Sequence, residues 1–428
     1  MPQARRSRRA FLWLSLVLLA AGCGDKVTAP QLGPYGSITI TAASDTATIG
    51  STVFFSAAVT DTSGNPVTLP VLTWQSSNTT VATIDGQGRL TPRTEGTTVV
   101  HASGGGVISN AFTVVVIQDI GWVDQSPASL TLNNLNGVHF YDRVRGWVVG
   151  DVGTILTTDD AGLTWSRQTS NSAGFTLNAV FFPTATHGFV VGAAGRVLET
   201  TNGGSTWSVR TGIPNAGLSQ RDIFFVDANH GWIVGNAGLI LRTKDAGATW
   251  NRDTSQTVLD LYSVWAATAP GPDTTVWAVG AQGEIVGSDD GGETWTNVPS
   301  PSSLAFHAVV RRSRDDAFAV GAANLAAQTI NIGSGPDWQL APAPIPFTEF
   351  YGLAWAVPSQ LMAVGETTGG TPAILRSMDN GATWSPQTLP SSALQSNRGL
   401  RDVWFVDGNY GWAVGKQGTI VHTATGGT

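Results

Sequence analysis

A phrase ending in Val-Gly recurs seven times in this 428-residue chain. The copies are GWVVG (146–150), GFVVG (188–192), GWIVG (231–235), WAVG (277–280), FAVG (318–321), MAVG (362–365) and GWAVG (411–415). Their final glycines lie 42, 43, 45, 41, 44 and 50 residues apart. Self-similarity at such a period indicates one supersecondary unit repeated many times, which limits the fold more than any other feature of the chain.

Each unit is predicted to contain four strands. An apolar strand such as NAVFF comes first, the Val-Gly strand second, a strand such as TILTT third, and a fourth begins at a tryptophan. The composition agrees, because 51 Gly and 16 Trp with only 12% charged residues suit tight turns between apolar strands. Four-stranded units at this period are typical of a β-propeller, whose sheets cover each other's faces. We therefore predict an all-β fold with a propeller over residues 119–428.

The two ends of the repeat predict how the ring closes. The seventh unit ends at HTATGGT and lacks the fourth-strand tryptophan of the other six: Trp165, Trp207, Trp250, Trp295, Trp338 and Trp384. Ahead of the first unit, IGWVDQS places Trp122 at the matching position. We expect a seven-bladed propeller whose last blade takes its outer strand from the N-terminal side, since this pairs otherwise bare strand edges.

A different pattern occupies residues 37–117. Short alternating strands from SITITA to AFTVVVI, separated by SGNP, GQG and GGG turns, predict a β-sandwich. The segment around Trp74, with SSNTTVATID and the GRLT turn, resembles a group 2 bacterial immunoglobulin-like domain. The resemblance implies a spacer or adhesion module, and we expect Trp74 to fill the sandwich core.

The N-terminus has the parts of a secretory signal: four arginines, an apolar stretch from 11 to 21, and small residues before Cys23. The segment LAAGC resembles the lipobox of bacterial lipoproteins, and SRRAFL resembles the twin-arginine export motif. We expect residues 1–22 to be a signal peptide, Cys23 to be lipidated and residues 23–35 to be a tether. The protein would then be lipid-anchored in the cell envelope, extracytoplasmic, on the periplasmic face or at the cell surface.

The charge of the chain argues against a nucleic-acid partner. The formal net charge is −7, and the predicted signal peptide holds four arginines and no acids, so the remainder would carry −11. A protein that binds nucleic acid is expected to carry a basic face, which complements the phosphate charge.

A second phrase marks the turn between the third and fourth strands. It recurs as TDDAGLTW, TTNGGSTW, TKDAGATW, SDDGGETW and SMDNGATW and resembles the Asp-box of the bacterial neuraminidase repeat. A carboxylate there can accept N–H bonds within the turn. An asparagine can replace it as an acceptor, but an asparagine could not replace it as a general acid. A weak Ca²⁺ site is the alternative. The predicted turn acceptors are Asp160, Asn202, Asp245, Asp290 and Asp379.

Together with phrases such as FFVDANHGWIVG, the Asp-box makes residues 119–428 resemble the seven-bladed photosystem II stability and assembly factor family. Plant and cyanobacterial members of that family are assembly factors with a basic client-binding patch. The resemblance implies a non-catalytic scaffold for a protein client, which could be a membrane protein, with Arg221, Arg398 and Arg401 as a remnant of the patch. No cofactor is expected. His187 and His230 lack a ligand pattern, so no metal is expected, and a monomer is predicted.

One position varies while the surrounding repeat is constant. It opens the first strand of each unit, near the mouth of the predicted channel, and always holds a polar or aromatic residue. A fixed scaffold can present a binding site in this way, and Arg and Tyr are enriched at binding hot spots. Strand starts also tolerate polar residues simply because they are near solvent. The predicted binding residues are Asn136, Asn178, Arg221, Tyr262, His307, Tyr351 and Arg401.

Two other functions stay open. A surface adhesin would use the sandwich as a spacer and the propeller to bind glycan or matrix. A sialidase-like glycoside hydrolase would need a carboxylate pair, or an arginine triad with a tyrosine nucleophile and its glutamate. Glu349 and Tyr351 in FTEFYG are the one suggestive pair, and the Arg-Ile-Pro segment that sialidases usually show is missing. No catalytic residue is assigned.

Overall fold

The computed structural model divides the chain into two units, residues 1–118 and 119–428. It describes residues 35–427 except 43, 50–51, 68–70, 118–120, 215–216, 269–273, 314–315, 332–335 and 343–348. The predicted signal peptide, Cys23 and nearly all of the tether lie outside the described residues. Within the described residues the elements are strands and short 3-10 turns, which confirms the all-β class, and none of them is a helix long and apolar enough to span a membrane.

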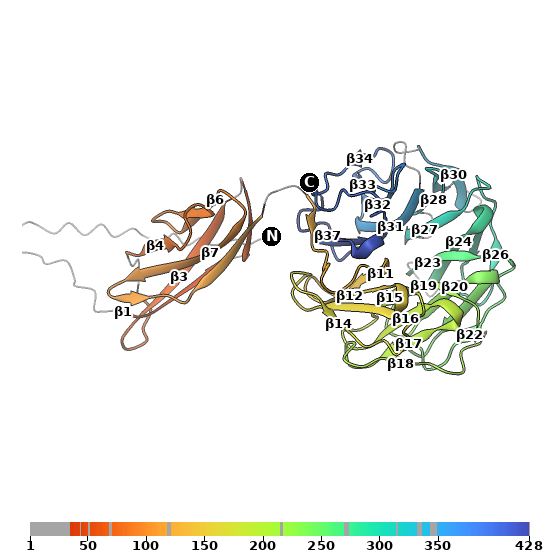
Figure 1. Cartoon of the computed structure of the whole chain (residues 1–428), viewed down its shortest axis with the longest axis horizontal. Coiled ribbons are helices and arrows are strands. Elements are labelled where there is room, and N and C mark those ends of the chain that lie inside the picture. The colour runs from red at the N-terminus through yellow and green to blue at the C-terminus, as the bar shows by residue number, and fades with distance from the viewer. Residues whose placement is uncertain are drawn as a thin grey trace, which may run out of the picture. The chain divides into compact units, whose positions relative to one another are not determined.

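Unit 1 contains two sheets around one apolar core (Figure 1). One sheet has the order β1 (Tyr35–Ala42), β3 (Val53–Asp61), β6 (Arg89–Pro92) and β5 (Ala82–Ile84). The other has the order β2 (Thr46–Thr48), β9 (Phe112–Ile117), β7 (Gly96–Gly104) and β4 (Thr73–Ser76), with β8 (Val107–Ile108) beside β7.

Trp74 does not fill the core of unit 1 as expected. Its ring is half-buried and packs against the core from the side, 5.9 Å from the ring of Phe55. The core between the sheets is formed instead by Phe55 and by aliphatic residues such as Ile40 and Val114.

Unit 2 is a ring of four-stranded sheets, drawn from yellow to blue in Figure 1. In its described residues there are seven such sheets, as predicted. The first three blades are β11 (Leu135–Phe140), β12 (Gly146–Gly150), β13 (Thr154–Thr158) and β14 (Ser166–Arg167); β15 (Leu177–Phe181), β16 (Gly188–Gly192), β17 (Val197–Thr200) and β18 (Ser208–Val209); and β19 (Gln220–Phe225), β20 (Gly231–Gly235), β21 (Leu239–Thr243) and β22 (Asn251–Arg252).

The next three blades are β23 (Leu261–Thr268), β24 (Thr274–Gly280), β25 (Ile285–Ser288) and β26 (Thr296–Asn297); β27 (Phe306–Ser313), β28 (Asp316–Gly321), β29 (Ala326–Asn331) and β30 (Pro336–Leu340); and β31 (Glu349–Val357), β32 (Gln360–Glu366), β33 (Pro372–Ser377) and β34 (Ser385–Pro386). The seventh blade contains β35 (Leu400–Phe405), β36 (Gly411–Gly415) and β37 (Ile420–Thr423).

The ring closes through the strand that the sequence predicted. β10 (Val123–Asp124) pairs antiparallel with β37, with Val123 opposite His422, and becomes the outer strand of the seventh blade. Trp122, next to this strand, is fully buried. The two ends of the propeller therefore share one sheet, which leaves no bare edge at the closure.

The Val-Gly glycine faces a β-bulge in every blade. In the first blade Leu135 pairs with Gly150 and Gly137 with Val149, so Asn136 is left over. The same skip occurs at the same place in the other six blades. A Cβ added to Gly150 would lie 2.0 Å from the carbonyl oxygen of Asn134, so only glycine allows this close approach. The phrase that defines the repeat thus makes room for the bulge.

Candidate functional site

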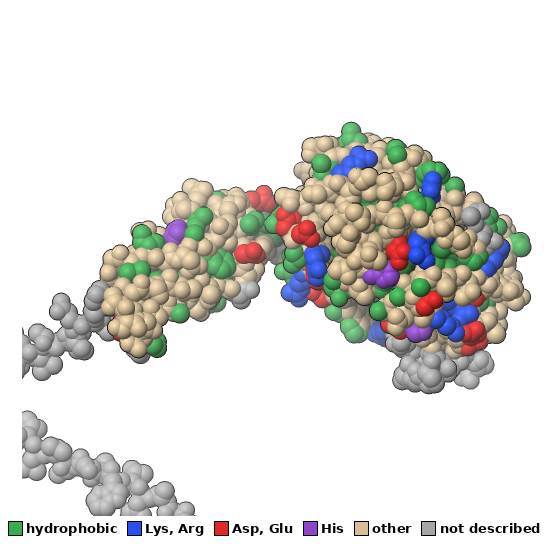
Figure 2. Space-filling model, turned by 90° about the horizontal axis from the view of Figure 1, so that it is seen from below, with side chains coloured by type: hydrophobic (Ala, Val, Ile, Leu, Met, Phe, Trp, Pro, Cys, Tyr) green, Lys and Arg blue, Asp and Glu red, His purple; other side chains and the backbone are tan. Residues whose placement is uncertain are grey.

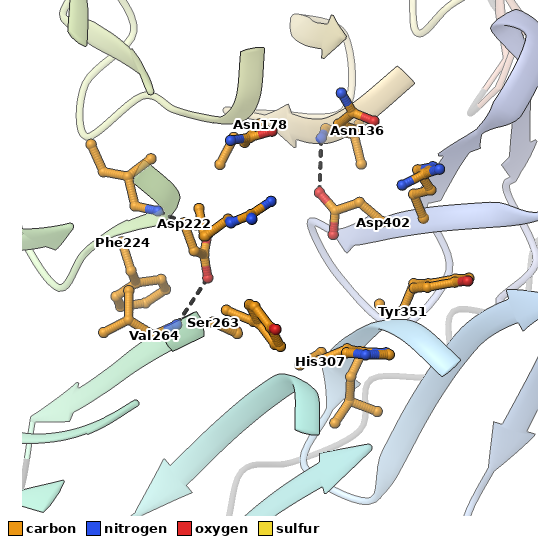
Figure 3. Close-up of a pocket in the computed structure, with 18 of the residues that line it drawn as sticks. Asn136, Asn178, Asp222, Phe224, Ser263, Val264, His307, Tyr351 and Asp402 are labelled. Carbon is orange, nitrogen blue, oxygen red and sulfur yellow. Dashed lines mark hydrogen bonds between the residues drawn. The ribbon is translucent and has the colours of Figure 1, made fainter. Parts of the chain in front are cut away.

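The seven residues predicted to bind are the seven bulged residues. Since a bulge bends its strand and re-aims a side chain, all seven point toward the end of the central channel. There they line one hollow (Figure 3). We call these seven residues the mouth ring. The structure therefore brings the whole predicted set together: Asn136, Asn178, Arg221, Tyr262, His307, Tyr351 and Arg401. Their role in binding stays a prediction.

Three members of the mouth ring tie their blade to the next one. Asn136 Nδ2 donates to the carbonyl of Leu177 at 3.0 Å, and Asn178 Nδ2 donates to that of Gln220 at 2.6 Å. His307 Nδ1 lies 2.7 Å from the carbonyl oxygen of Phe350. These side chains therefore have a structural role in addition to any contact with a ligand.

From the third blade to the seventh, the mouth ring is a continuous arc of ring contacts. The Arg221 guanidinium lies 5.8 Å from the Tyr262 ring centre, and Tyr262 lies 5.8 Å from His307. His307 stacks on Tyr351 at 5.3 Å, and the Arg401 guanidinium lies 5.7 Å from Tyr351. Two cations thus flank three rings, a surface suited to hydrogen bonding and stacking.

A second tier, directly after the bulge, also lines the channel and was missed by the sequence analysis. Asp222 accepts from the Val264 amide at 2.9 Å, and Asp402 accepts from the Val138 amide at 2.9 Å, each across to the neighbouring blade (Figure 3). Ser263 accepts from the next blade in the same way at 3.3 Å. The available signal was the acid in QRDIFF and LRDVWF, where other units carry small residues.

Burial in the channel wall raises the pKa of both carboxyls. The pKa of Asp222 rises to about 6 and that of Asp402 to about 7, the latter also because Asp222 carries a like charge. Each side chain keeps a part of its surface open to the channel. Among the described residues no basic side chain contributes to these pKa shifts, although Arg221 and Arg401 line the rim of the same cavity.

The suggestive pair of the hydrolase alternative does meet in space. The Tyr351 hydroxyl donates to Glu349 at 2.6 Å and lies 3.2 Å from Glu366, which in turn binds Lys416 at 2.6 Å. Burial first, and then these carboxylates, raise the pKa of the Tyr351 phenol well above its usual range. The raised pKa keeps the Tyr351 phenol protonated at neutral pH, so Glu349 would have to act as its base in any hydrolase.

The Asp-box turns lie on the opposite face and repeat the same bonds. In the first, Asp160 accepts from the Thr164 amide at 2.8 Å, from the Thr164 hydroxyl at 2.6 Å and from the Thr158 hydroxyl at 2.8 Å. Asp245, Asp290 and Asp379 bond their turns in the same way. Asn202 also accepts from the turn amide and from the Thr200 hydroxyl, but its Nδ2 donates to the Thr206 hydroxyl. These oxygens are thereby occupied by the chain itself, and the described residues contain no group of three or more acids, histidines or cysteines placed to hold a metal ion.

The third arginine of the proposed patch lies apart from the other two. Arg398 belongs to the loop before β35, where it donates to the carbonyl of Ser392 at 3.2 Å, and it is not among the residues that line the mouth. On the face of unit 2 seen in Figure 2, acidic and basic side chains are intermixed. The resemblance to a basic patch is therefore limited to Arg221 and Arg401.

Comparisons with known proteins agree with this architecture. A family model described as photosynthesis system II assembly factor YCF48 matches residues 170–260 and 214–299, and one for the intimin immunoglobulin-like domain matches residues 70–106. A solved structure, YCF48 bound to D1 peptide, is 24% identical with a TM-score of 0.58, covering 71% of this chain and 95% of that one. Unit 2 carries a YCF48-like propeller.

Two further solved structures match the same share of the chain. YCF48 from Cyanidioschyzon merolae is 18% identical with a TM-score of 0.57, and covers 71% of this chain and 98% of that one. A virginiamycin B lyase from Staphylococcus aureus is 13% identical with a TM-score of 0.59, with the same coverage. No curated protein matches the sequence. Since both non-enzymes and enzymes share the fold, function has to be argued from the site.

Proposed function

We propose that this protein is a non-catalytic scaffold, lipid-anchored in the cell envelope, whose mouth ring binds a protein client. One observation carries the proposal: seven identical bulges present seven side chains of differing chemistry around one hollow. A scaffold that only had to close its ring would have no need for an arc of three aromatic rings flanked by two cations. Such residues are typical of protein-binding hot spots.

The comparisons support this class of function. A propeller of the same type is known bound to a peptide, the D1 peptide, which supports a role for this fold in binding a protein segment. For the present protein we leave the client open, since the net charge of −7 is far from that of a strongly basic binding domain. A membrane or envelope protein is the expected class, because the predicted anchor would hold the propeller beside the bilayer.

The test is crosslinking of the full-length protein in its native cells, followed by identification of the captured partners. We expect the Arg221→Ala, Arg401→Ala double variant to lose at least tenfold of the yield of specific partners. Arg167→Ala, an exposed arginine on the outer strand β14, is the matched control and should leave the yield unchanged. Equal loss in the control, or no loss in the double variant, would contradict the proposal.

Other outcomes would identify the alternatives. Arginine-dependent binding to glycans or matrix, without a protein partner, would favour an adhesin. Turnover of a fluorogenic sialoside that Tyr351→Phe abolishes would replace the scaffold with a hydrolase.

A further inference from the structure

The mouth ring, the second tier below it and the aromatic rings further in line one cavity of about 130 Å³. We call its deeper part the inner cavity; it is lined by the second tier and, further in, by aromatic rings. Asp222 and Asp402 project into it from opposite sides (Figure 3). They belong to the third and seventh blades, which are as far apart as two blades of a seven-membered ring can be.

Four aromatic side chains form the floor of the inner cavity. Phe181 contacts Phe224 at 5.3 Å between ring centres, and Phe224 contacts Trp265 at 4.4 Å. Trp265 contacts Trp404 at 6.2 Å, and Trp404 returns to Phe181 at 5.8 Å. The contacts therefore form a closed cycle of rings at the end of the cavity. The π-faces of such rings attract cations, most strongly where water is excluded.

The scaffold itself does not require acids in the second tier. The equivalent residue is glycine or alanine in four other blades, at Gly137, Ala179, Ala308 and Gly352, and the bond across to the next blade is made in the fourth blade by the neutral hydroxyl of Ser263. A largely buried carboxylate whose only partners are neutral amides still costs free energy, because no cation balances its charge. Two of them facing one cavity therefore indicate a ligand that repays this cost.

We propose that the inner cavity binds an alkylammonium group, held between the two carboxylates and the aromatic floor. Each carboxylate oxygen accepts one amide N–H and keeps further lone pairs for a cation. The cavity suits the slim end of a lysine side chain or of a small free amine. The lysine source rests on the proposed client-binding function, whereas the free amine does not.

The other polar groups around the cavity are compatible with a cation. Arg221 and Arg401 line the rim of the same cavity, where Arg221 Nε donates to Asn236 at 2.8 Å and the Arg401 guanidinium lies over Tyr351. His307 is bonded to the next blade. Beyond the floor, burial lowers the pKa of His139 to about 3, so this imidazole is neutral and does not repel a cation.

Titration calorimetry of the full-length protein with n-butylammonium chloride tests the inference, with 1-butanol as the neutral probe. We expect butylammonium to bind and butanol not to bind. Affinity should rise from pH 5.5 to pH 8, because the carboxylates must lose their protons before they can pair with the cation. The Asp222→Asn, Asp402→Asn double variant keeps acceptors for the cross-blade amides, and it should lose at least tenfold of the affinity together with the pH dependence.

Three results would overturn the inference: no heat with butylammonium, equal binding of butanol, or unchanged affinity in a double variant whose melting temperature matches the wild type. Arg167→Ala is the control and should bind as the wild type does. Nα-acetyl-lysine methylamide, added as a competitor, identifies the source: displacement supports a client lysine, and failure to displace supports a free amine. If butylammonium binds but the crosslinking yield does not depend on Arg221 and Arg401, the client-binding function is contradicted and the amine site is still supported.

Discussion

The two faces of the propeller use repetition in opposite ways. On one face, five Asp-box turns repeat both the backbone and the bonding side chain, so that Asp160 and Asn202 make matching contacts. On the other face the bulge repeats but its side chain changes in almost every blade. A side chain with the same structural role in every blade needs the same chemistry each time, whereas the side chains of a binding site can differ. Repeated side chains therefore indicate turn closure, and varying ones indicate positions available for recognition.

The largest effect is expected where the repeat is strictest, at the Val-Gly glycine. Gly150→Ala would place a Cβ 2.0 Å from the carbonyl oxygen of Asn134, so the bulge or the strand pairing has to shift. We expect a loss of about 3 kcal/mol or more in the free energy of unfolding. Denaturant titration followed by tryptophan fluorescence measures it. Gly86→Ala, where an added Cβ meets nothing within 4 Å, should change stability little; equal effects would refute the close-approach argument.

A smaller effect is expected in the Asp-box turns. Asp290→Ala removes acceptors for the Thr294 amide and hydroxyl and for the Ser288 hydroxyl, which should cost about 1–2 kcal/mol of unfolding free energy. Asp290→Asn should cost far less, because Asn202 already makes the equivalent bonds in the second blade. Thermal denaturation of the two variants measures the difference. A metal-binding role would instead make the two variants equally harmful and the wild type sensitive to a chelator.

The last comparison concerns the pH dependence of stability. An aspartate in the unfolded chain has a pKa of about 3.9, whereas the pKa of Asp222 is about 6 and that of Asp402 about 7 in the folded protein. Between these values the folded state holds more protons than the unfolded state, so stability falls as the pH rises from about 5 to 8. The Asp-box carboxyls have lowered pKa values and stay ionised throughout this window.

Melting temperatures at pH 5 and pH 8 measure this effect. The wild type should melt a few degrees lower at pH 8, and the Asp222→Asn, Asp402→Asn variant should show a smaller difference. An equal difference in both proteins would mean that the two aspartates titrate normally and that the inner cavity is well solvated.

Much of the architecture could be predicted because each repeat contains motifs that mark its strands and turns. The Val-Gly phrase, the Asp-box and the terminal tryptophans located the strands, and the displaced Trp122 predicted the closure through β10. The mouth residues could be found because their position in the repeat is equivalent in every unit. Trp74 was misplaced because a tryptophan in a strand can pack at the margin of a core as well as within it.

The second tier was missed for a geometric reason. Successive residues of a regular strand point to opposite faces, so a residue next to the mouth ring should turn away from the channel. The bulge breaks this alternation and allows Arg401 and Asp402, or Arg221 and Asp222, to line the same cavity. The bulged strand itself carries no mark of the bulge, because the bulge depends on pairing with the glycine of the neighbouring Val-Gly strand.

By itself the sequence determined the number of blades, the order of their strands, the closure and the two faces, because these follow from a repeated pattern of apolar residues and turns. Only the tertiary structure decided that two acids meet across the channel above an aromatic floor. That arrangement brings together residues of blades distant in the chain, and it exists only when the ring has closed and the bulges have aimed them inward.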